Sequence, residues 1–322
     1  MSRVILPEYP MVDVETYRRV LEGVATVEVA AMDDADDVVA AASDAEAVVV
    51  DVSTPVPASV FERLPDLRAV ARSSVGVAGV DVAAAAEAGV AVLHAPAYCL
   101  DEVATHAVAL LLACVRAVPE YDRAVRAGEW PRKPSRPLHR LRGRTLGLVA
   151  FGRIARAVRE RVAGFDLDVV AYDPYVDPGT MVDADVGRVG REELFARADH
   201  VSVHAPDTTE TRGLVDADAL GALPADGVVV NTGRGGIVDE DALAAALEAD
   251  DLGAAGLDVF EEEPLPADSP LRGRDDVVFT PHAAWYSEEA RRDVNETIAR
   301  DLRRVLTGAT PENAVDPGAD WL

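Results

Sequence analysis

Three short segments in the second half of the chain each place a reactive side chain just after an apolar run that is typical of a β-strand. Arg234 lies in NTGRGGIVDE, Glu263 in LDVFEEEP and His282 in TPHAAWYSEE. A guanidinium can bind a carboxylate through two hydrogen bonds and polarise a neighbouring carbonyl. An imidazole can exchange a proton with an oxygen atom, and a carboxylate beside it stabilises its charged form. The three side chains are therefore candidate catalytic residues for the interconversion of a 2-oxo acid and a 2-hydroxy acid.

Taken singly, these residues have ordinary explanations. An arginine after a strand is usually part of a surface ion pair, and a glutamate in the run EEEP usually faces solvent, as we expect of Glu261 and Glu262. The three motifs together support a catalytic site, because a dinucleotide-binding turn precedes them in the chain.

That turn lies in AFGRIA, between an expected strand and an expected helix. Ala150, Gly152 and Ala155 occupy the three positions of the pattern G-x-G-x-x-G/A. Gly152 leaves room for a pyrophosphate at the helix N-terminus, whereas Ala150 departs from the pattern. Asp173 ends the next expected strand, where a carboxylate accepts hydrogen bonds from the adenosine ribose and repels the extra phosphate of NADP. The predicted cofactor is therefore NAD. The alternative interpretation of the Gly152 motif is an ordinary turn between a strand and a helix, and that of Asp173 is a residue that merely begins an Asp-Pro turn.

Short β-rich runs alternate with Ala-rich helical runs, which is typical of βαβ units and parallel sheets. Two such units precede residue 100, but the dinucleotide turn comes only near residue 150. We therefore expect an α/β protein with two Rossmann-like or flavodoxin-like domains, the cofactor domain (101–286) being inserted into the substrate domain (1–100 plus 287–322). Substrate and cofactor would meet in the cleft between them. The strand candidates are 47–52, 67–71, 90–93, 145–150, 169–172, 200–203, 228–231, 254–257 and 277–280.

The net charge of the 322-residue chain is −26, from 57 acidic and 31 basic side chains. Such a surface repels nucleic acid and anionic membranes. Lys133 is the only lysine, so we expect adaptation to a high-salt cytoplasm, in which counterions screen the repulsion.

The N-terminus lacks the pattern of a signal peptide, and the most apolar stretch, 107–115, is too short to cross a bilayer. We therefore expect a cytoplasmic location. Cys99 and Cys114 have no partners at metal-ligand spacing, so no metal site is expected.

The segment 116–144 is a locally basic arm, with nine Lys or Arg against three Asp or Glu. We expect it to pack on the acidic surface of an identical subunit, which predicts a homodimer. Binding of nucleic acid is the less favoured alternative.

The spacing and the residues of the three motifs resemble those of the D-isomer-specific 2-hydroxyacid dehydrogenases. Within that family, HAAWYSE at 282–288 is most similar to the branch that contains the C-terminal binding proteins. The resemblance covers nearly the whole chain. It implies an NAD-dependent oxidoreductase for small D-2-hydroxy acids, in which Arg234 binds the substrate, Glu263 pairs with the histidine and His282 is the acid/base. An NAD(H)-sensing scaffold and a phosphoglycerate dehydrogenase are the alternatives.

The resemblance also implies further contacts. The amides of Val75 and Gly76, in SSVGVAGVD, and the side chain of Trp285 would bind the substrate. The implied cofactor contacts, besides Gly152, Asp173 and Arg234, are Arg153, Ile154, Ala205, Pro206, Thr211, Thr232, Gly233 and Asp258. The sequence departs from the family pattern at Gly233, where alanine is common, and at Thr105, where glutamate is common.

Overall fold

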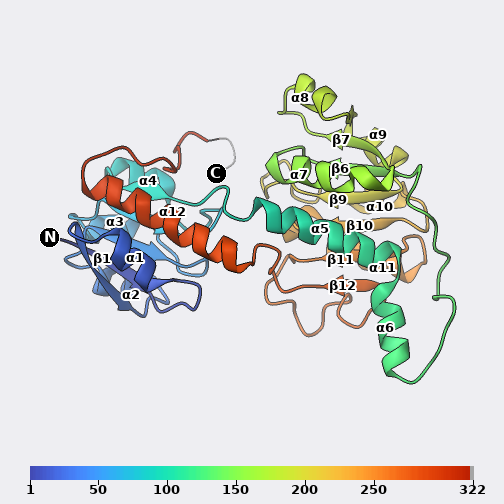
Figure 1. Cartoon of the computed structure of the whole chain (residues 1–322), viewed down its shortest axis with the longest axis horizontal. Coiled ribbons are helices and arrows are strands. Elements are labelled where there is room, and N and C mark those ends of the chain that lie inside the picture. Colours follow the sequence, from blue (N-terminus) through green and yellow to red (C-terminus); the bar gives the residue numbers. More distant parts are fainter. Residues whose placement is uncertain (320–322) are drawn as a thin grey trace. The chain divides into compact units, whose positions relative to one another are not determined.

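The chain divides into two compact units, each built around its own parallel β-sheet (Figure 1). The computed structural model describes residues 1–319. Unit 1 comprises Met1–Cys99 and Tyr286–Leu322, and unit 2 comprises Leu100–Trp285. Residues 320–322, which end the predicted substrate domain, lie outside the described residues. Because unit 2 interrupts unit 1 in the sequence, the predicted α/β class with an inserted domain is confirmed.

Unit 1 holds a five-stranded sheet in the order β2-β1-β3-β4-β5. Along β3, Val48 and Val50 pack into one apolar layer, and Ala47 and Val49 pack into the layer on the opposite face. Both faces of the strand are thus buried, as in most parallel sheets. The strands are β1 Ser2–Pro7, β2 Ala25–Ala30, β3 Ala47–Val50, β4 Ala69–Arg72 and β5 Ala91–Leu93. The helices are α1 Val14–Val20, α2 Ala35–Ala41, α3 Ala58–Arg63, α4 Val82–Glu87 and α12 Glu288–Leu306.

Unit 2 holds a seven-stranded sheet in the order β12-β11-β10-β9-β6-β7-β8, and all its pairs are parallel. The chain runs from β6 to β7 and β8 and then returns to β9 on the other side of β6. This reversal creates a switch point at the carboxyl ends of β6 and β9, where open α/β sheets bind ligands. The strands are β6 Thr145–Val149, β7 Asp168–Tyr172, β8 Gly187–Arg188, β9 His200–Val203, β10 Val228–Asn231, β11 Ala254–Leu257 and β12 Val277–Phe279.

Helices cover both faces of the unit 2 sheet. Leu110 of α5 and Val158 of α7 pack on one face, and Leu194 of α9 and Leu243 of α11 pack on the other. A Cβ on Gly256 of β11 would lie 2.9 Å from the Leu110 Cβ, so the glycine lets α5 pack closely on the sheet. The α-helices are α5 Leu100–Val115, α6 Val118–Arg126, α7 Arg153–Val162, α8 Pro178–Asp183, α9 Arg191–Arg197, α10 Ala217–Gly221 and α11 Glu240–Glu248. Two 3₁₀ helices are η1 Ala163–Phe165 and η2 Gly235–Ile237.

Within residues 1–319, no single helix has the length and apolar composition needed to cross a bilayer. Only α5 and α6 taken together meet those criteria, and they bend by 63° at the break between them.

Candidate functional site

The predicted site residues of unit 2 follow the carboxyl ends of six parallel strands. In the order of the strands β6, β7, β9, β10, β11 and β12, the first of them are Gly152, Asp173, Ala205, Thr232, Asp258 and His282. The carboxyl ends of parallel strands lie at one edge of the sheet. This edge includes the switch point between β6 and β9, so the sequence motifs are gathered where an open α/β sheet binds ligands.

His282 and Glu263 form a hydrogen-bonded pair, with Nδ1 of the histidine 2.8 Å from Oε2 of the glutamate. The other carboxyl oxygen, Oε1, accepts a hydrogen bond of 3.1 Å from the backbone N–H of Phe260. The two side chains are 44% and 38% exposed, so a small molecule can reach them. Because Nδ1 faces the carboxyl group, Nε2 is the ring nitrogen available to a ligand.

Opposing effects set the pKa of the Glu263 carboxyl. Burial raises it, but hydrogen bonds from His282 and from the Phe260 N–H, with the positive charges of His282 and Arg234, outweigh burial and leave the pKa below its ordinary value. The carboxylate form therefore persists to lower pH, and it can stabilise a positive charge on the neighbouring imidazole.

Arg234 lies in the turn between β10 and η2, and its neighbours shape that turn. The side-chain amide of Asn231, which is 1% exposed, donates to the Arg234 carbonyl at 2.9 Å. A Cβ on Gly235 would lie only 1.8 Å from the carbonyl carbon of Phe260. Glycine is thus required for this turn to contact the segment that carries Glu263. The Arg234 side chain itself is exposed.

Asp258 is 1% exposed and holds the turn that carries His282. Its Oδ1 accepts from the Ala283 N–H at 2.9 Å, and its Oδ2 accepts from the Ala284 N–H at 3.0 Å. Its backbone carbonyl accepts from the His282 N–H at 2.7 Å. These bonds support a costly conformation, since His282 has a φ of 53°, in the left-handed region. The predicted contact of Asp258 with a cofactor stays a prediction.

The turn after β6 has the geometry of an anion site. Gly152 precedes α7 with φ −72° and ψ −166°, and an added Cβ there would meet no atom within 4 Å. Neither the backbone nor the packing of the protein requires glycine at this position. The amides of Arg153 and Ile154, in the first turn of α7, have no acceptor inside the helix and suit an anionic group. Ala150 has a φ of 70°, a conformation that favours the glycine of the general pattern.

Asp173, 8% exposed, ties this turn to the end of β7. Its Oδ2 accepts from the Phe151 N–H at 2.8 Å, and its Oδ1 accepts from the N–H groups of Tyr175 and Val176 at 2.9 and 3.1 Å. The carboxylate thus also fulfils the turn role considered as an alternative. A carboxylate has about four lone-pair positions, so one is left for a ribose hydroxyl.

The ends of β9 and β10 carry the remaining cofactor candidates. A Cβ on Gly233 would lie 3.0 Å from the Ala205 carbonyl oxygen, so the two ends are in close backbone contact. The Thr211 hydroxyl donates to the Pro206 carbonyl at 2.5 Å. The Thr232 hydroxyl is buried and has no hydrogen-bond partner within residues 1–319. A buried, unsatisfied hydroxyl at this edge is suited to a ligand.

Val75 and Gly76 lie in unit 1, between β4 and α4, and their turn is held by two hydrogen bonds. His94 Nδ1 donates to the Val75 carbonyl at 2.7 Å, and the Ser74 hydroxyl donates to the Gly76 carbonyl at 2.6 Å. Trp285 is partly buried at the end of unit 2. The roles of Val75, Gly76 and Trp285 towards a substrate stay predictions.

Sequence reasoning missed the residues that shape the Arg234 turn. Asn231 is a polar residue at the end of the buried run VVVN, and Gly235 is the first of two glycines after the arginine. A buried polar strand end and a double glycine are the signals that could have pointed to them.

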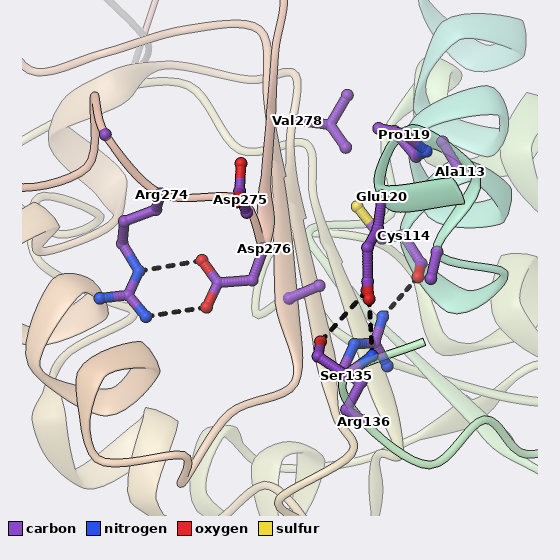
Figure 2. A pocket seen from close by; sticks show the side chains of 13 residues that line it. Ala113, Cys114, Pro119, Glu120, Ser135, Arg136, Arg274, Asp275, Asp276 and Val278 are labelled. Atoms are coloured by element: carbon purple, nitrogen blue, oxygen red, sulfur yellow. Dashed lines mark hydrogen bonds and ion pairs between the residues drawn. The ribbon is translucent and has the colours of Figure 1, made fainter. Parts of the chain in front are cut away.

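A cavity of about 270 Å³ lies between α5, α6 and the segment before β12 (Figure 2). It contains none of the predicted site residues, and Ala254, at the amino end of β11, lines it. Its arginines already have partners: Arg274 makes hydrogen bonds of 2.9 and 2.8 Å to Asp276, and Arg136 donates to the Cys114 carbonyl. Within residues 1–319, no group of three or more His, Cys, Asp or Glu side chains is arranged to hold a metal ion.

Comparison with known proteins adds to this geometry. A family model described as "D-isomer specific 2-hydroxyacid dehydrogenase, NAD binding domain" matches residues 108–284, in agreement with the predicted cofactor. D-3-phosphoglycerate dehydrogenase from Mycobacterium tuberculosis (strain ATCC 25618 / H37Rv) is 42% identical over 285 residues, which are 88% of this chain and 54% of that protein. Glyoxylate reductase from Korarchaeum cryptofilum (strain OPF8) is 39% identical over 277 residues, which are 85% of this chain and 83% of that protein.

The solved structure of the TT0316 protein from Thermus thermophilus is similar to nearly the whole chain. Its TM-score is 0.88 at 33% sequence identity, and the match covers 98% of this chain and 100% of that one. By contrast, the chain spans about half the length of the curated phosphoglycerate dehydrogenases that it matches. The branch inferred from HAAWYSE stays a prediction.

Proposed function

Because the chain belongs to the D-isomer-specific 2-hydroxyacid dehydrogenase family, we propose that it transfers a hydride between NAD(H) and the α-carbon of a small D-2-hydroxy acid or 2-oxo acid. The observation that supports this most directly is the 2.8 Å pair of His282 and Glu263 at the carboxyl edge of the unit 2 sheet. The turn that carries Arg234 packs against the same segment. A proton donor, its charge partner and a carboxylate-binding group are what this reaction requires.

The proposed roles follow from the free atoms of each side chain. Arg234 binds the substrate carboxylate and polarises the adjacent carbonyl. Nε2 of His282 gives a proton to the carbonyl oxygen during reduction and removes it from the hydroxyl during oxidation. Glu263 holds Nδ1 of the ring and stabilises the charge that the ring carries. Bound NAD(H) would supply or accept the hydride.

The residues after β6 and β7 fit the cofactor. The space beside Gly152 that a Cβ would fill, and the unpaired amides of Arg153 and Ile154, suit a pyrophosphate. The buried carboxylate of Asp173 has one acceptor position left for an unmodified ribose hydroxyl and disfavours a phosphate, which supports NAD over NADP.

Steady-state kinetics with glyoxylate, hydroxypyruvate and larger 2-oxo acids, each with NADH and NADPH, test the proposal. His282→Ala should lower kcat by about 10²- to 10⁴-fold, the usual contribution of proton transfer, and leave the Kd for NADH unchanged. Glu262→Gln, an exposed neighbour of Glu263, is the matched control and should retain full activity. Near-normal turnover by His282→Ala would exclude the role of the histidine. NADH binding without turnover of any acid would favour the scaffold alternative.

Phosphoglycerate oxidation is the second candidate, supported by the names of several relatives that are about 40% identical to this chain. The chemistry at Arg234, Glu263 and His282 would be the same. Adding 3-phosphohydroxypyruvate to the substrate panel separates the candidates, because kcat/KM ranks the acids directly.

We further propose that the protein is a cytoplasmic homodimer adapted to high salt. α6 has no buried residue, and Val118, Val125 and Trp130 on this arm are 54%, 49% and 78% exposed, which supports an interface with a second copy. Deletion of the arm 116–144 should then yield monomers in light scattering, and a surviving dimer would refute the interface. The charge of −26 with a single lysine supports the salt adaptation. Full stability in dilute buffer would contradict it.

A further inference from the structure

A chain of polar side chains runs from α5 to the turn that carries His282, all within unit 2. Nε2 of His106, on α5, lies 2.9 Å from the Thr280 hydroxyl, which lies 2.6 Å from Oδ1 of Asp258. The same Nε2 is 3.8 Å from Oδ1 of Asp258. His106 is the only basic group within 4.0 Å of this buried carboxyl among residues 1–319.

The direction of each hydrogen bond follows from the groups involved. Oδ1 of Asp258 already accepts the Ala283 N–H, so it is an acceptor towards Thr280 as well. The single hydroxyl proton of Thr280 is therefore used on Asp258, and the hydroxyl oxygen can only accept from its other neighbour. Nε2 of His106 is consequently the donor, which fixes the tautomer and the orientation of this ring.

These hydrogen bonds stabilise a backbone conformation at His282 that a residue other than glycine disfavours. His282 has a φ of 53°, and Asp258 holds the N–H groups of His282, Ala283 and Ala284. If the Asp258 side chain turns away, two of these three bonds are lost. A left-handed non-glycine residue persists only while its surroundings enforce it.

We propose that His106 is a positioning residue for His282: by donating to Thr280, it holds the hydroxyl on Asp258 and so keeps the 282–284 turn in its conformation. His106 touches none of the proposed reacting groups. The kinetic part of this inference rests on the proposed function; the structural part does not.

The test compares His106→Leu, which removes the donor, with His106→Gln, whose amide nitrogen is the same number of bonds from Cα as Nε2. His106→Leu should lower kcat by roughly 10- to 100-fold, because small displacements of a reacting group are costly. The KM for the 2-oxo acid and the Kd for NADH should change less, and His106→Gln should restore most of the loss. Thr280→Val should resemble His106→Leu, and the double variant should be no worse than either single one, since both break the same chain.

Backbone amide exchange supplies a readout that does not depend on activity. The amides of Ala283 and Ala284 should exchange at least about 10-fold faster in His106→Leu. The Ala219 amide, which donates to the Asp216 side chain that caps α10, should exchange at an unchanged rate. His139→Leu is the matched control, because its Nε2 also lies near an aspartate, 3.7 Å from Asp226, away from this turn.

Unchanged exchange at Ala283 and Ala284 in His106→Leu overturns the inference, whether or not the enzyme is active. Additive losses in the double variant, or a His106→Gln variant as impaired as His106→Leu, also overturn it. If the wild-type protein turns over no 2-oxo acid, the proposed function fails, while faster amide exchange would still support the positioning role.

Discussion

The substitution Gly152→Ala tests whether Gly152 is needed for folding or for binding a ligand. The backbone at Gly152, with φ −72° and ψ −166°, is open to any residue, and the new Cβ would meet no atom of the protein within 4 Å. The methyl group would instead occupy the space in front of the first amides of α7, where we place the pyrophosphate. We therefore expect a binding defect without a folding defect.

The expected magnitudes follow from these contacts. Alanine restricts the unfolded chain, which stabilises the protein by about 0.4–1 kcal/mol. As the residue that precedes a helix, alanine is less favourable than glycine by roughly 0.5–1 kcal/mol. The two effects nearly cancel, so the unfolding free energy should change by less than about 0.5 kcal/mol. The Kd for NADH should rise at least about 10-fold, which is about 1.4 kcal/mol of binding free energy.

Thermal unfolding with and without NADH measures both quantities. NADH at about 100 times the wild-type Kd stabilises the wild type by about 2.7 kcal/mol, and a tenfold weaker variant by only about 1.4 kcal/mol. Without NADH, the two melting temperatures should agree within about 2 °C. A wild-type response to NADH in Gly152→Ala would refute the placement of the pyrophosphate.

Gly147→Ala is the matched control, because this glycine, in β6 just before the turn, is needed for packing. Its Cβ would lie 3.0 Å from the Ala198 Cβ and from the Leu194 Cδ2. Overpacking of this kind costs about 1–3 kcal/mol of stability, while the folded fraction should bind NADH normally. The two glycines should therefore give opposite results. A Gly152→Ala variant as unstable as Gly147→Ala would refute the reasoning about packing.

Three further predictions concern stability and its dependence on pH. Because the pKa of Glu263 is lowered, its stabilising contribution is present above the unfolded value of about 4.3 and is lost as pH falls through the folded value. The stability difference between wild type and Glu263→Gln in urea should thus shrink as the solution is acidified through this range, and a constant difference would contradict us. Burial lowers the pKa of His200 to about 4, so below about pH 6.5 the unfolded state binds a proton that the folded state does not. Between these values the wild type should lose up to about 1.4 kcal/mol per pH unit more than His200→Leu, and an equal loss in the two proteins would contradict the lowered pKa of the histidine. Ala150→Gly should raise the unfolding free energy by about 0.5–1 kcal/mol, since relief of about 1–2 kcal/mol of strain exceeds the entropy cost of glycine; a lower melting temperature would count against this.

The sequence predicts the strands of unit 2 better than the first strands of unit 1. Strands such as β10, VVVN, are continuous apolar runs that are buried on both faces and are easy to recognise. β1 and β2 are absent from the predicted strands. β1 ends at Pro7, which argues against a strand, and β2 is mostly solvent-accessible, so it lacks a full apolar run. β8, with only two residues, gives no pattern at all.

Local motifs point to the proposed reacting groups but not to the residues that hold them in place. Arg234, Glu263 and His282 stand next to strand ends that the sequence marks, so their types and positions could be read directly. His106 could not be linked to them, because its partner Thr280 is 174 residues away in the chain. The requirement for Gly235 likewise arises from the backbone of a different strand end. Contacts of this kind depend on how the sheet brings segments together, which no local pattern contains.

Two residues with a disfavoured backbone conformation lie where we place the chemistry. Within residues 1–319, six non-glycine residues have a positive φ, and three of them are aspartates, which tolerate this conformation. Two of the others, Ala150 and His282, lie at the carboxyl edge of the unit 2 sheet. At Ala150, substitution by glycine would relieve the strain. Glycine cannot replace His282 in the same way, because the proposed reaction needs the imidazole, so its conformation must instead be enforced by the hydrogen bonds of Asp258. The hydrogen bonds from His106 through Thr280 to Asp258 are then the expected consequence of placing the proposed acid/base histidine in a disfavoured conformation.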